Sequence, residues 1–275
     1  MKINGENNVI LIKGAGDLAT GVAWRLKRAG FDIVMTEIEK PLTVRLSVAY
    51  SSAVYQEETT IEGITGKLAH DFDEVKSILQ QDKIAVIVDE EATIKEKLQP
   101  TVIIDAIMAK YNINTKIDDA PVVIAVGPGF CAGKDCDYVI ETKRGHFLGR
   151  VIEEGFAIKN TGVPGNIGGF TTERIIRSNN QGIFKAVAKI GDTVCKNDVV
   201  AYVDNVEILA QIDGVVRGML HDDIFVSSNM KCGDIDPRAE KSHCFTISDK
   251  SRAIGGGALE AVMHGLFKLK YRENN

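Results

Sequence analysis

A glycine-rich turn near the start of the chain constrains the fold more than any other feature. The turn, from Gly14 to Ala19, follows a short apolar run at 9–12 and precedes a segment whose apolar residues recur every four positions. The first pattern predicts a buried β-strand and the second an amphipathic helix with one apolar stripe. Gly30 then ends the helix, and a second apolar run follows at 33–35. This order predicts a βαβ unit with parallel strands.

The turn has the spacing of a phosphate-binding loop. Gly14 allows the tight turn, Gly16 lets the backbone approach a pyrophosphate, and Ala19 in the third position still permits close packing of the helix on the strand. Backbone N–H groups at the helix start, from Asp17 and Leu18 onward, supply an anion site. We therefore expect a Rossmann-like nucleotide-binding domain. The alternative is that the glycines only make a turn in an α/β sheet.

Two carboxylates bear on which nucleotide binds. Glu37 lies about 20 residues beyond the glycines, where it can accept hydrogen bonds from ribose hydroxyls and would repel a 2′-phosphate. NAD(H), or another nucleotide with free ribose hydroxyls, is therefore favoured over NADP. Asp17 would crowd a pyrophosphate electrostatically, or as N-cap it would satisfy the donors of the helix start.

Further apolar runs extend the predicted sheet. Continuous runs at 84–88, 102–104 and 122–126 are typical of strands covered on both faces. Asp71 and Glu74 have capping-box spacing, which predicts a helix over 71–81. The β-branched stretch 44–60 is interpreted as an insertion or an extra strand pair.

The second half of the chain has a different organisation. Glycines crowd into 160–169, and short strands broken by Gly-Asp and Asp-Gly pairs follow, which predicts an all-β module. The module is similar to the biotinyl/lipoyl-type hammerhead, a small barrel-sandwich, but the turn 204–207 has no carrier lysine. Helical spacing returns after Gly255-Gly256-Gly257, which are interpreted either as an anion site ahead of a final helix or as a plain connection. We expect an α/β fold with a Rossmann-like domain at 1–165 and the β module with the C-terminal helix at 166–275.

A second glycine loop carries two cysteines. Gly127 and Gly129 follow a predicted strand and are assigned to cofactor binding, and Cys131 and Cys136 come directly after them. Because ligands of α/β sheets bind at the carboxyl edge, we expect both thiols there, with Lys134 lowering a thiol pKa. The alternative is that they pack as small buried hydrophobes, as free cysteines usually do. The spacing is not that of a tetrahedral zinc site, so no metal site is predicted.

Several segments carry a resemblance that covers the whole chain. They are Gly14-Ala15-Gly16-Asp17-Leu18-Ala19-Thr20-Gly21, Gly127-Pro128-Gly129-Phe130, Glu141-Thr142-Lys143-Arg144-Gly145-His146, Asn160-Thr161-Gly162 and Lys231-Cys232-Gly233-Asp234-Ile235-Asp236-Pro237-Arg238. On these segments the chain resembles the YqeB-type family of accessory proteins for selenium-dependent molybdenum hydroxylases, whose Rossmann part is similar to XdhC-like factors. The resemblance implies a maturation role and, as partner, the apo form of a molybdenum hydroxylase like xanthine dehydrogenase.

Three functions follow as hypotheses. The first is a maturation factor that binds a nucleotide or a molybdopterin dinucleotide and assists insertion of selenium or sulfur, with Cys131 and Cys136 holding the chalcogen. The second is an NAD(H)-dependent oxidoreductase, for which His146 is the candidate acid or base in the N-terminal half besides His70. The third is a docking scaffold with a degenerate nucleotide site. The sequence leaves open whether the chain is an enzyme and whether it forms a homodimer.

Composition excludes some partners. The net charge of -5 gives no basic field for nucleic acid, and no window approaches a membrane span. The polar N-terminus 1–8 lacks the pattern of a secretory signal, and the five cysteines do not form an even disulfide framework. We therefore expect a cytoplasmic protein with no membrane or nucleic-acid partner.

Overall fold

A computed structural model describes residues 9–273. The segment 1–8, on which the expected absence of a secretory signal depends, lies outside the described residues. Two compact units form, and the chain passes between them four times. Unit 1 comprises 1–39, 50–160 and 247–275, and unit 2 comprises 40–49 and 161–246. No helix in the described part of the chain has the length and apolar character needed to cross a membrane.

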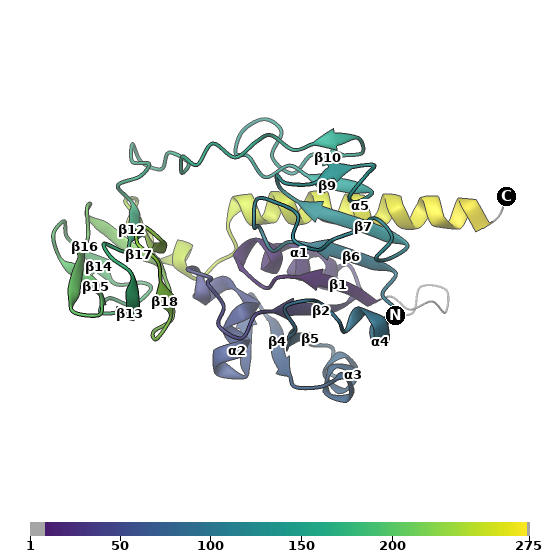
Figure 1. Ribbon diagram of the computed structural model, residues 1–275, viewed down its shortest axis with the longest axis horizontal. Coiled ribbons are helices and arrows are strands. Elements are labelled where there is room, and N and C mark those ends of the chain that lie inside the picture. Colours follow the sequence, from purple (N-terminus) through teal and green to yellow (C-terminus); the bar gives the residue numbers. More distant parts are fainter. Residues whose placement is uncertain (1–8, 274–275) are drawn as a thin grey trace. The chain divides into compact units, whose positions relative to one another are not determined.

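Unit 1 is built on one large sheet of mostly parallel strands (Figure 1). Across the described residues the sheet has nine strands in the order β10-β9-β7-β6-β1-β2-β5-β4-β3. Only β3 and β10, at its two edges, run antiparallel to their neighbours. The strands are β1 (Val9–Lys13), β2 (Asp32–Glu37), β3 (Glu58–Ile61), β4 (Ile64–Ala69), β5 (Ile84–Val88), β6 (Val102–Asp105), β7 (Val122–Val126), β9 (Tyr138–Ile140) and β10 (Val151–Ile152). A separate pair joins β8 (Cys131–Ala132) to β11 (Gly155–Phe156).

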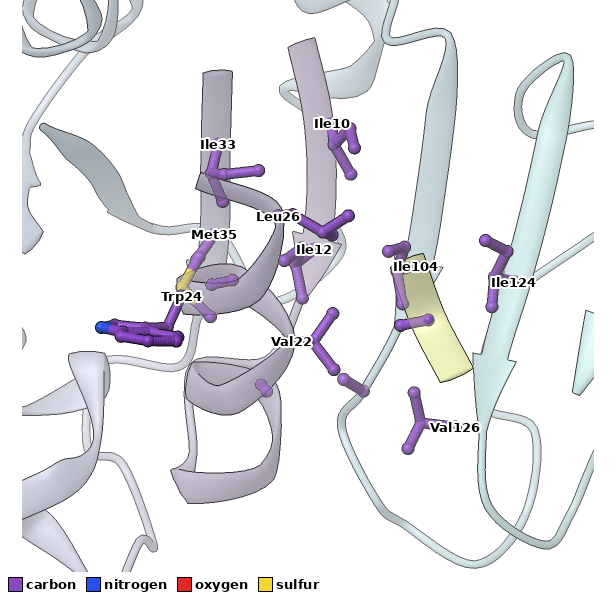
Figure 2. Packing of buried hydrophobic residues seen from close by; sticks show 14 of the residues in the cluster. Ile10, Ile12, Val22, Trp24, Leu26, Ile33, Met35, Ile104, Ile124 and Val126 are labelled. Atoms are coloured by element: carbon purple, nitrogen blue, oxygen red, sulfur yellow. The ribbon is translucent and has the colours of Figure 1, made fainter. Parts of the chain in front are cut away.

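Helices cover both faces of this sheet because its central strands are apolar on both sides. Ile10 and Ile12 of β1 pack on the face that carries α1 (Asp17–Arg28) and α5 (Asp249–Glu273), as Figure 2 shows for the α1 side. Leu11, which points the other way, packs with α3 (Phe72–Gln80). The remaining helices of the unit are short: η2 (Tyr50–Ser52), α2 (Ala53–Gln56) and α4 (Lys95–Leu98).

Helix α3 has the start that the capping-box spacing predicts. The Asp71 carboxylate accepts a hydrogen bond from the backbone N–H of Glu74 at 2.8 Å. The Glu74 carboxylate accepts in turn from the backbone N–H of His70 at 2.9 Å. These bonds satisfy donors that a helix start otherwise leaves unpaired, so the local sequence is sufficient to define this helix.

No helix lies in the described chain between β6 and β7 or between β7 and β9, and α5 covers this part of the sheet instead. It packs along α1 and against β7, β9 and β10. Two glycines allow this approach: a Cβ on Gly255 would lie 2.5 Å from the Gly21 carbonyl oxygen, and one on Gly257 would lie 2.1 Å from that of Gly149. The glycines thus lie inside the helix and serve packing. The interpretation of 255–257 as an anion site ahead of a helix is wrong.

Unit 2 is all-β and consists of two antiparallel sheets of four strands each within the described residues. One contains β12 (Ile175–Arg177), β19 (Lys231–Asp236), β17 (Gly214–Met219) and β14 (Thr193–Val194). The other contains β16 (Val206–Leu209), β15 (Val199–Val203), β13 (Gly182–Ala186) and β18 (Phe225–Val226). Inward side chains of both sheets, among them Phe184 and Ile235, form one apolar core. Two short helices accompany the sheets: η1 (Leu46–Val48) and η3 (Lys241–Cys244).

The division of the chain differs from the expected boundary at 165. The C-terminal helix belongs to unit 1, and the segment 40–49 belongs to unit 2. That segment is held by backbone and side-chain bonds: Met219 N–H donates to the Val44 carbonyl at 2.6 Å, and Ser47 Oγ donates to the Cys244 carbonyl at 2.5 Å. The stretch 44–60, expected as an insertion or a strand pair, forms mainly the short helices η1, η2 and α2, and the strand pair β3–β4 starts only at Glu58.

Candidate functional site at the carboxyl edge of the large sheet

The carboxyl ends of the parallel strands gather most of the predicted binding residues of unit 1. The strand order reverses at β1, which has β2 on one side and β6 on the other. In parallel sheets the crevice at such a reversal is where ligands bind. The glycine loop after β1, Glu37 at the end of β2 and the glycine loop after β7 all lie at this edge.

The first glycine loop is tightly fitted between neighbouring segments. Gly14 has φ of +90°, and a Cβ there would lie 3.1 Å from the Ala106 carbonyl oxygen. Its N–H donates to the Thr36 carbonyl at 2.9 Å. The Ala15 carbonyl accepts from the Ser51 N–H at 2.9 Å. The loop therefore needs glycine at position 14 for both its conformation and its space.

Helix α1 begins with donors that no side chain caps among the described residues. Gly16, not Asp17, is the N-cap residue, with φ of -66° and ψ of -179°. The alternative of Asp17 as N-cap is thus wrong, because Asp17 is already the first residue of the helix. The first hydrogen bond within the helix runs from the Thr20 N–H to the Gly16 carbonyl at 2.8 Å. The amides of Leu18 and Ala19 belong to the turn that a helix leaves without internal partners, which is a ready anion site.

Glu37 lies against this loop. Its Oε2 accepts from the Ala15 N–H at 3.0 Å and its Oε1 from the Ile38 N–H at 2.9 Å. Burial raises the pKa of this carboxyl group, and the two backbone hydrogen bonds oppose that rise. Each carboxylate oxygen retains a lone pair for a further donor. Glu37 thus stiffens the loop and keeps hydrogen-bond acceptors at this edge of the sheet.

The second glycine loop contacts the segment that follows β6. A Cβ on Gly127, at φ of +87°, would lie 3.1 Å from Thr142 Oγ1 and 3.2 Å from Met108 Cε. One on Gly129, at φ of +112°, would lie 2.7 Å from the backbone of Tyr111. Both glycines are therefore required where they stand, and the two loops are linked through the segment 106–111.

A buried polar cluster that the sequence interpretation did not include lies beneath this edge. Lys13 Nζ donates to Thr115 Oγ1 at 2.6 Å and to Asn114 Oδ1, and it lies 3.6 Å from Asp105 Oδ2. Thr115 Oγ1 donates to Asp105 Oδ2 at 2.6 Å. Burial lowers the pKa of Lys13, and Asp105 partly restores it. The available signal was that Lys13 and Asp105 are charged residues that directly end two apolar runs.

Cys136, the second cysteine after the second glycine loop, is not at the carboxyl edge. After Gly129 the chain turns back, and Asp137, the residue after Cys136, accepts from the Val123 N–H at 2.8 Å near the amino end of β7. Cys136 is fully buried, and burial, with neighbouring carboxylates, raises its pKa to about 12. The expected lowering of this thiol pKa is therefore wrong for Cys136, which packs as a small apolar residue.

Cys131 is half-buried on β8, where its N–H donates to Asp135 Oδ2 at 2.8 Å. It pairs with Phe156 of β11. Lys134, expected to act on the thiols, lies in the turn between the cysteines. Cys131 therefore belongs to the two-stranded sheet of β8 and β11.

His146 and Glu141 follow β9 at the carboxyl edge and take different roles. His146 is exposed and its ring contacts the Phe147 ring edge-on at 5.0 Å. Glu141 is buried, and its carboxylate accepts from the N–H groups of Lys143 at 2.7 Å and Ile158 at 2.8 Å. Because Cys136 lies near the amino end of β7, the structure does not bring Cys136 and His146 together as one catalytic group.

In unit 2 the polar segment 231–238 forms β19 and a turn. Asp236 pairs with Arg238, with 2.6 Å between Nη2 and Oδ2. Asp234 instead pairs with Arg174, a residue 60 positions earlier in the chain. Within residues 9–273 no group of three or more His, Cys, Asp or Glu side chains is arranged to hold a metal ion.

Comparison with known proteins gives one extensive sequence relative. The chain is 49% identical over 257 residues to a protein of Escherichia coli (strain K12) described as "Uncharacterized protein YqeB". The match covers 94% of this chain and 48% of that protein, so the chain spans about half the length of the curated relative it matches. No protein-family model matches the chain.

Several solved structures give weak likenesses. An aspartoacylase family protein from Mesorhizobium loti aligns with a TM-score of 0.26 and 10% identity, over 84% of this chain and 85% of that one. A succinylglutamate desuccinylase/aspartoacylase from Rhodobacter sphaeroides aligns with a TM-score of 0.21 and 15% identity, over 23% of this chain and 21% of that one. The ectoine utilization protein EutE (DoeB) from Ruegeria pomeroyi aligns with a TM-score of 0.22 and 19% identity, over 30% of this chain and 27% of that one. TM-scores this low carry no argument about fold or activity.

Proposed function

We propose that unit 1 is a Rossmann-like domain that binds a nucleotide-containing cofactor at the carboxyl edge of its large sheet. The observation that carries this proposal is the strand order β5-β2-β1-β6-β7-β9, which reverses at β1, where the glycine loop enters an uncapped helix. This is the order of doubly wound dinucleotide-binding sheets. NAD(H) and a molybdopterin dinucleotide both have the pyrophosphate and ribose that such a site takes.

The residues at the edge fit such a ligand. The pyrophosphate would lie on the N–H groups that start α1, where the helix dipole favours negative charge. Glu37, fixed by the Ala15 and Ile38 amides, would accept from the ribose hydroxyls. The loop of Gly127 and Gly129 would border the second half of a dinucleotide. The buried Lys13–Asp105 cluster fixes the segment after β6 through its hydrogen bonds with Thr115.

We propose further that unit 2 is a hammerhead-like barrel-sandwich without a carrier function. The support is its pair of four-stranded antiparallel sheets around one core and the hairpin β15–β16. The turn of that hairpin, Asp204-Asn205, has no lysine that could carry a swinging cofactor. A packing or docking role is therefore the better assignment for the unit.

For the whole chain we propose an accessory role in maturing a molybdenum hydroxylase, by holding a nucleotide-containing cofactor during assembly. The support is the resemblance of five separate segments, the first beginning at Gly14 and the last ending at Arg238, to accessory proteins for selenium-dependent molybdenum hydroxylases. Chalcogen transfer through Cys136 is not part of this proposal because its thiol is buried and protonated. The alternative is an NAD(H)-dependent oxidoreductase, which Glu37 favours by excluding a 2′-phosphate.

Nucleotide binding is tested with a substitution that should leave the fold intact. Gly16→Asp places a carboxylate at the N-cap, where the extended backbone suits it and where it satisfies the helix donors in place of a ligand. In calorimetric titrations with NAD⁺ and ADP, we expect saturable binding to the wild type and at least a tenfold loss in Gly16→Asp. Gln80→Glu, which adds the same charge at the exposed end of α3, is the control. Equal binding by wild type and Gly16→Asp would contradict the proposal.

The role of the whole chain needs separate measurements. Native mass spectrometry of protein purified from its own cells should detect a retained dinucleotide. Deleting the gene should lower the activity and chalcogen content of a molybdenum hydroxylase in the same cells. Unchanged hydroxylase, together with turnover of NAD(H) by the purified chain, would support the oxidoreductase instead.

A further inference from the structure

The outer face of one sheet in unit 2 carries buried charges. On β17 and β19, Val216 and Ile235 point into the apolar core. Their neighbours Arg217, Asp234 and Asp236 are also buried, with at most 7% of each residue exposed. Because side chains alternate along a strand, these three lie on the opposite face of the sheet from the core. Buried charges must be paired there, since removing them from water is costly.

The two carboxylates already have close partners. Asp234 pairs with Arg174, whose Nε also donates to the Gly165 carbonyl at 3.3 Å. Asp236 accepts two hydrogen bonds from the Arg238 guanidinium, at 2.9 and 2.6 Å. Burial alone would raise the pKa of Asp236, but Arg238, helped by Arg217, holds it below its usual value. Neither carboxylate is left to pair closely with Arg217.

Arg217 is the poorly matched charge of this group. Its side chain is 9% exposed, and its Nε lies 3.8 Å from Asp236 Oδ2 and 3.5 Å from the His243 carbonyl oxygen, both at the outer limit of an interaction. The two terminal nitrogens of its guanidinium make no hydrogen bond to any other residue in the described part of the chain. Neither terminal nitrogen is among the buried atoms of the described residues without a partner, so both reach solvent, and an acceptor from outside the chain can bind their four N–H donors.

Two more donor groups lie beside Arg217. Arg45, itself buried, donates through Nη2 to the same His243 carbonyl at 3.0 Å and to the Thr246 carbonyl at 3.2 Å. The His243 ring has a buried Nδ1 without a hydrogen-bond partner among the described residues. Burial raises the pKa of the nearby Cys244 thiol, and both Arg217 and Arg45 act on it in the opposite direction. Both guanidinium groups are thus close to one point of unit 2.

We propose that Arg217 is the centre of an oxyanion-binding site in unit 2, with Arg45 and His243 at its margin, that takes one carboxylate or phosphate group. A planar guanidinium with two free terminal nitrogens matches the paired oxygens of either group. The buried arginines Arg45, Arg174 and Arg217 outnumber the buried carboxylates Asp234 and Asp236. The local charge therefore favours an anion and disfavours a metal cation.

The site is tested by titrating the full chain with inorganic phosphate and, in a second arm, with acetate, at constant ionic strength. We expect saturable binding of at least one, weakened tenfold or more in Arg217→Gln. Arg177→Gln is the control, because Arg177 of β12 bonds the Asn229 carbonyl at the surface. Stronger binding in the phosphate arm identifies a phosphate ligand, and stronger binding in the acetate arm a carboxylate. No saturable binding in either arm, or equal binding by Arg217→Gln, would overturn the proposal.

Two further measurements keep the test independent of folding and of the nucleotide site. In the wild type, the anion should shift the imidazole resonances of His243 among the five histidines, and an unmoved His243 signal contradicts the site. Gly16→Asp should bind the anion as the wild type does, because it changes only unit 1. If Gly16→Asp removes anion binding, the anion was bound at the start of α1 and the proposal fails.

Discussion

Lys13 and Asp105 end neighbouring parallel strands opposite each other, and their charged side chains, 4% and 2% exposed, lie 3.6 Å apart. Thr115 bridges them, with 2.6 Å between its Oγ1 and each charged partner. This cluster anchors the segment after β6, which contacts both glycine loops. The pair therefore connects the stability of unit 1 to the geometry of its candidate binding edge.

Removing one member of this pair should destabilise the protein strongly. In Lys13→Met the Asp105 carboxylate stays buried without its counter-charge, and such losses cost about 3 to 5 kcal/mol. Urea unfolding followed by circular dichroism measures the change. Asp82→Asn is the control, because Asp82 pairs with Lys27 while 94% exposed, and exposed pairs contribute under about 1 kcal/mol. Equal effects of both substitutions would show that the buried pair has no special role.

The close packing of α1 on α5 predicts opposite effects for neighbouring glycines. Gly255→Ala places a Cβ 2.5 Å from the Gly21 carbonyl oxygen, so the helices must separate, at a cost of roughly 1 to 3 kcal/mol. Gly256→Ala meets nothing within 4 Å and removes a helix-interior glycine, which should stabilise by about 0.5 to 1 kcal/mol. Thermal unfolding of the two variants should give shifts of opposite sign. Shifts of the same sign would contradict the packing described for α5.

The Cys136 thiol should be unreactive in the folded protein. With a pKa of about 12, only roughly one thiol in ten thousand is thiolate at pH 8, and burial blocks access as well. Brief alkylation with iodoacetamide and peptide mass spectrometry should label exposed Cys195 and leave Cys136 unmodified. In denaturant all five cysteines should react, which controls for reagent and detection. Rapid labelling of Cys136 in the native state would restore it as a candidate nucleophile.

Glu37 should make stability depend on pH in a defined direction. Its pKa is raised in the folded state, so between the ordinary value of 4.5 and the raised value the folded protein binds more protons than the unfolded one. The free energy of unfolding therefore falls as pH rises through that window. Glu37→Gln lacks this contribution, so its stability relative to wild type should increase from pH 4.5 to 7.5. Urea unfolding at both pH values tests this, and a difference that stays constant or reverses contradicts the burial of the charge.

The local elements of this protein follow from short-range sequence patterns. The continuous apolar runs of β1, β5 and β7 and the four-residue spacing of α1 depend only on nearby residues, and the structure has these elements where the patterns predict them. Asp71 defines the start of α3 in the same way. The glycines at 14, 127 and 129 predict tight turns, and each has the positive φ that is costly for other residues.

Contacts between residues far apart in the chain depend on the tertiary fold. The residues of the final helix do not by themselves assign it to unit 1. Its glycines are required because the helix packs closely on the backbone of Gly21 and Gly149, which lie far away in the chain. Cys136 lies away from the expected carboxyl edge because the chain after Gly129 turns back to the amino end of β7. The partners of Lys13 and Arg217 lie far along the chain. Burial and charge pairing arise from such long-range contacts, which no local pattern encodes.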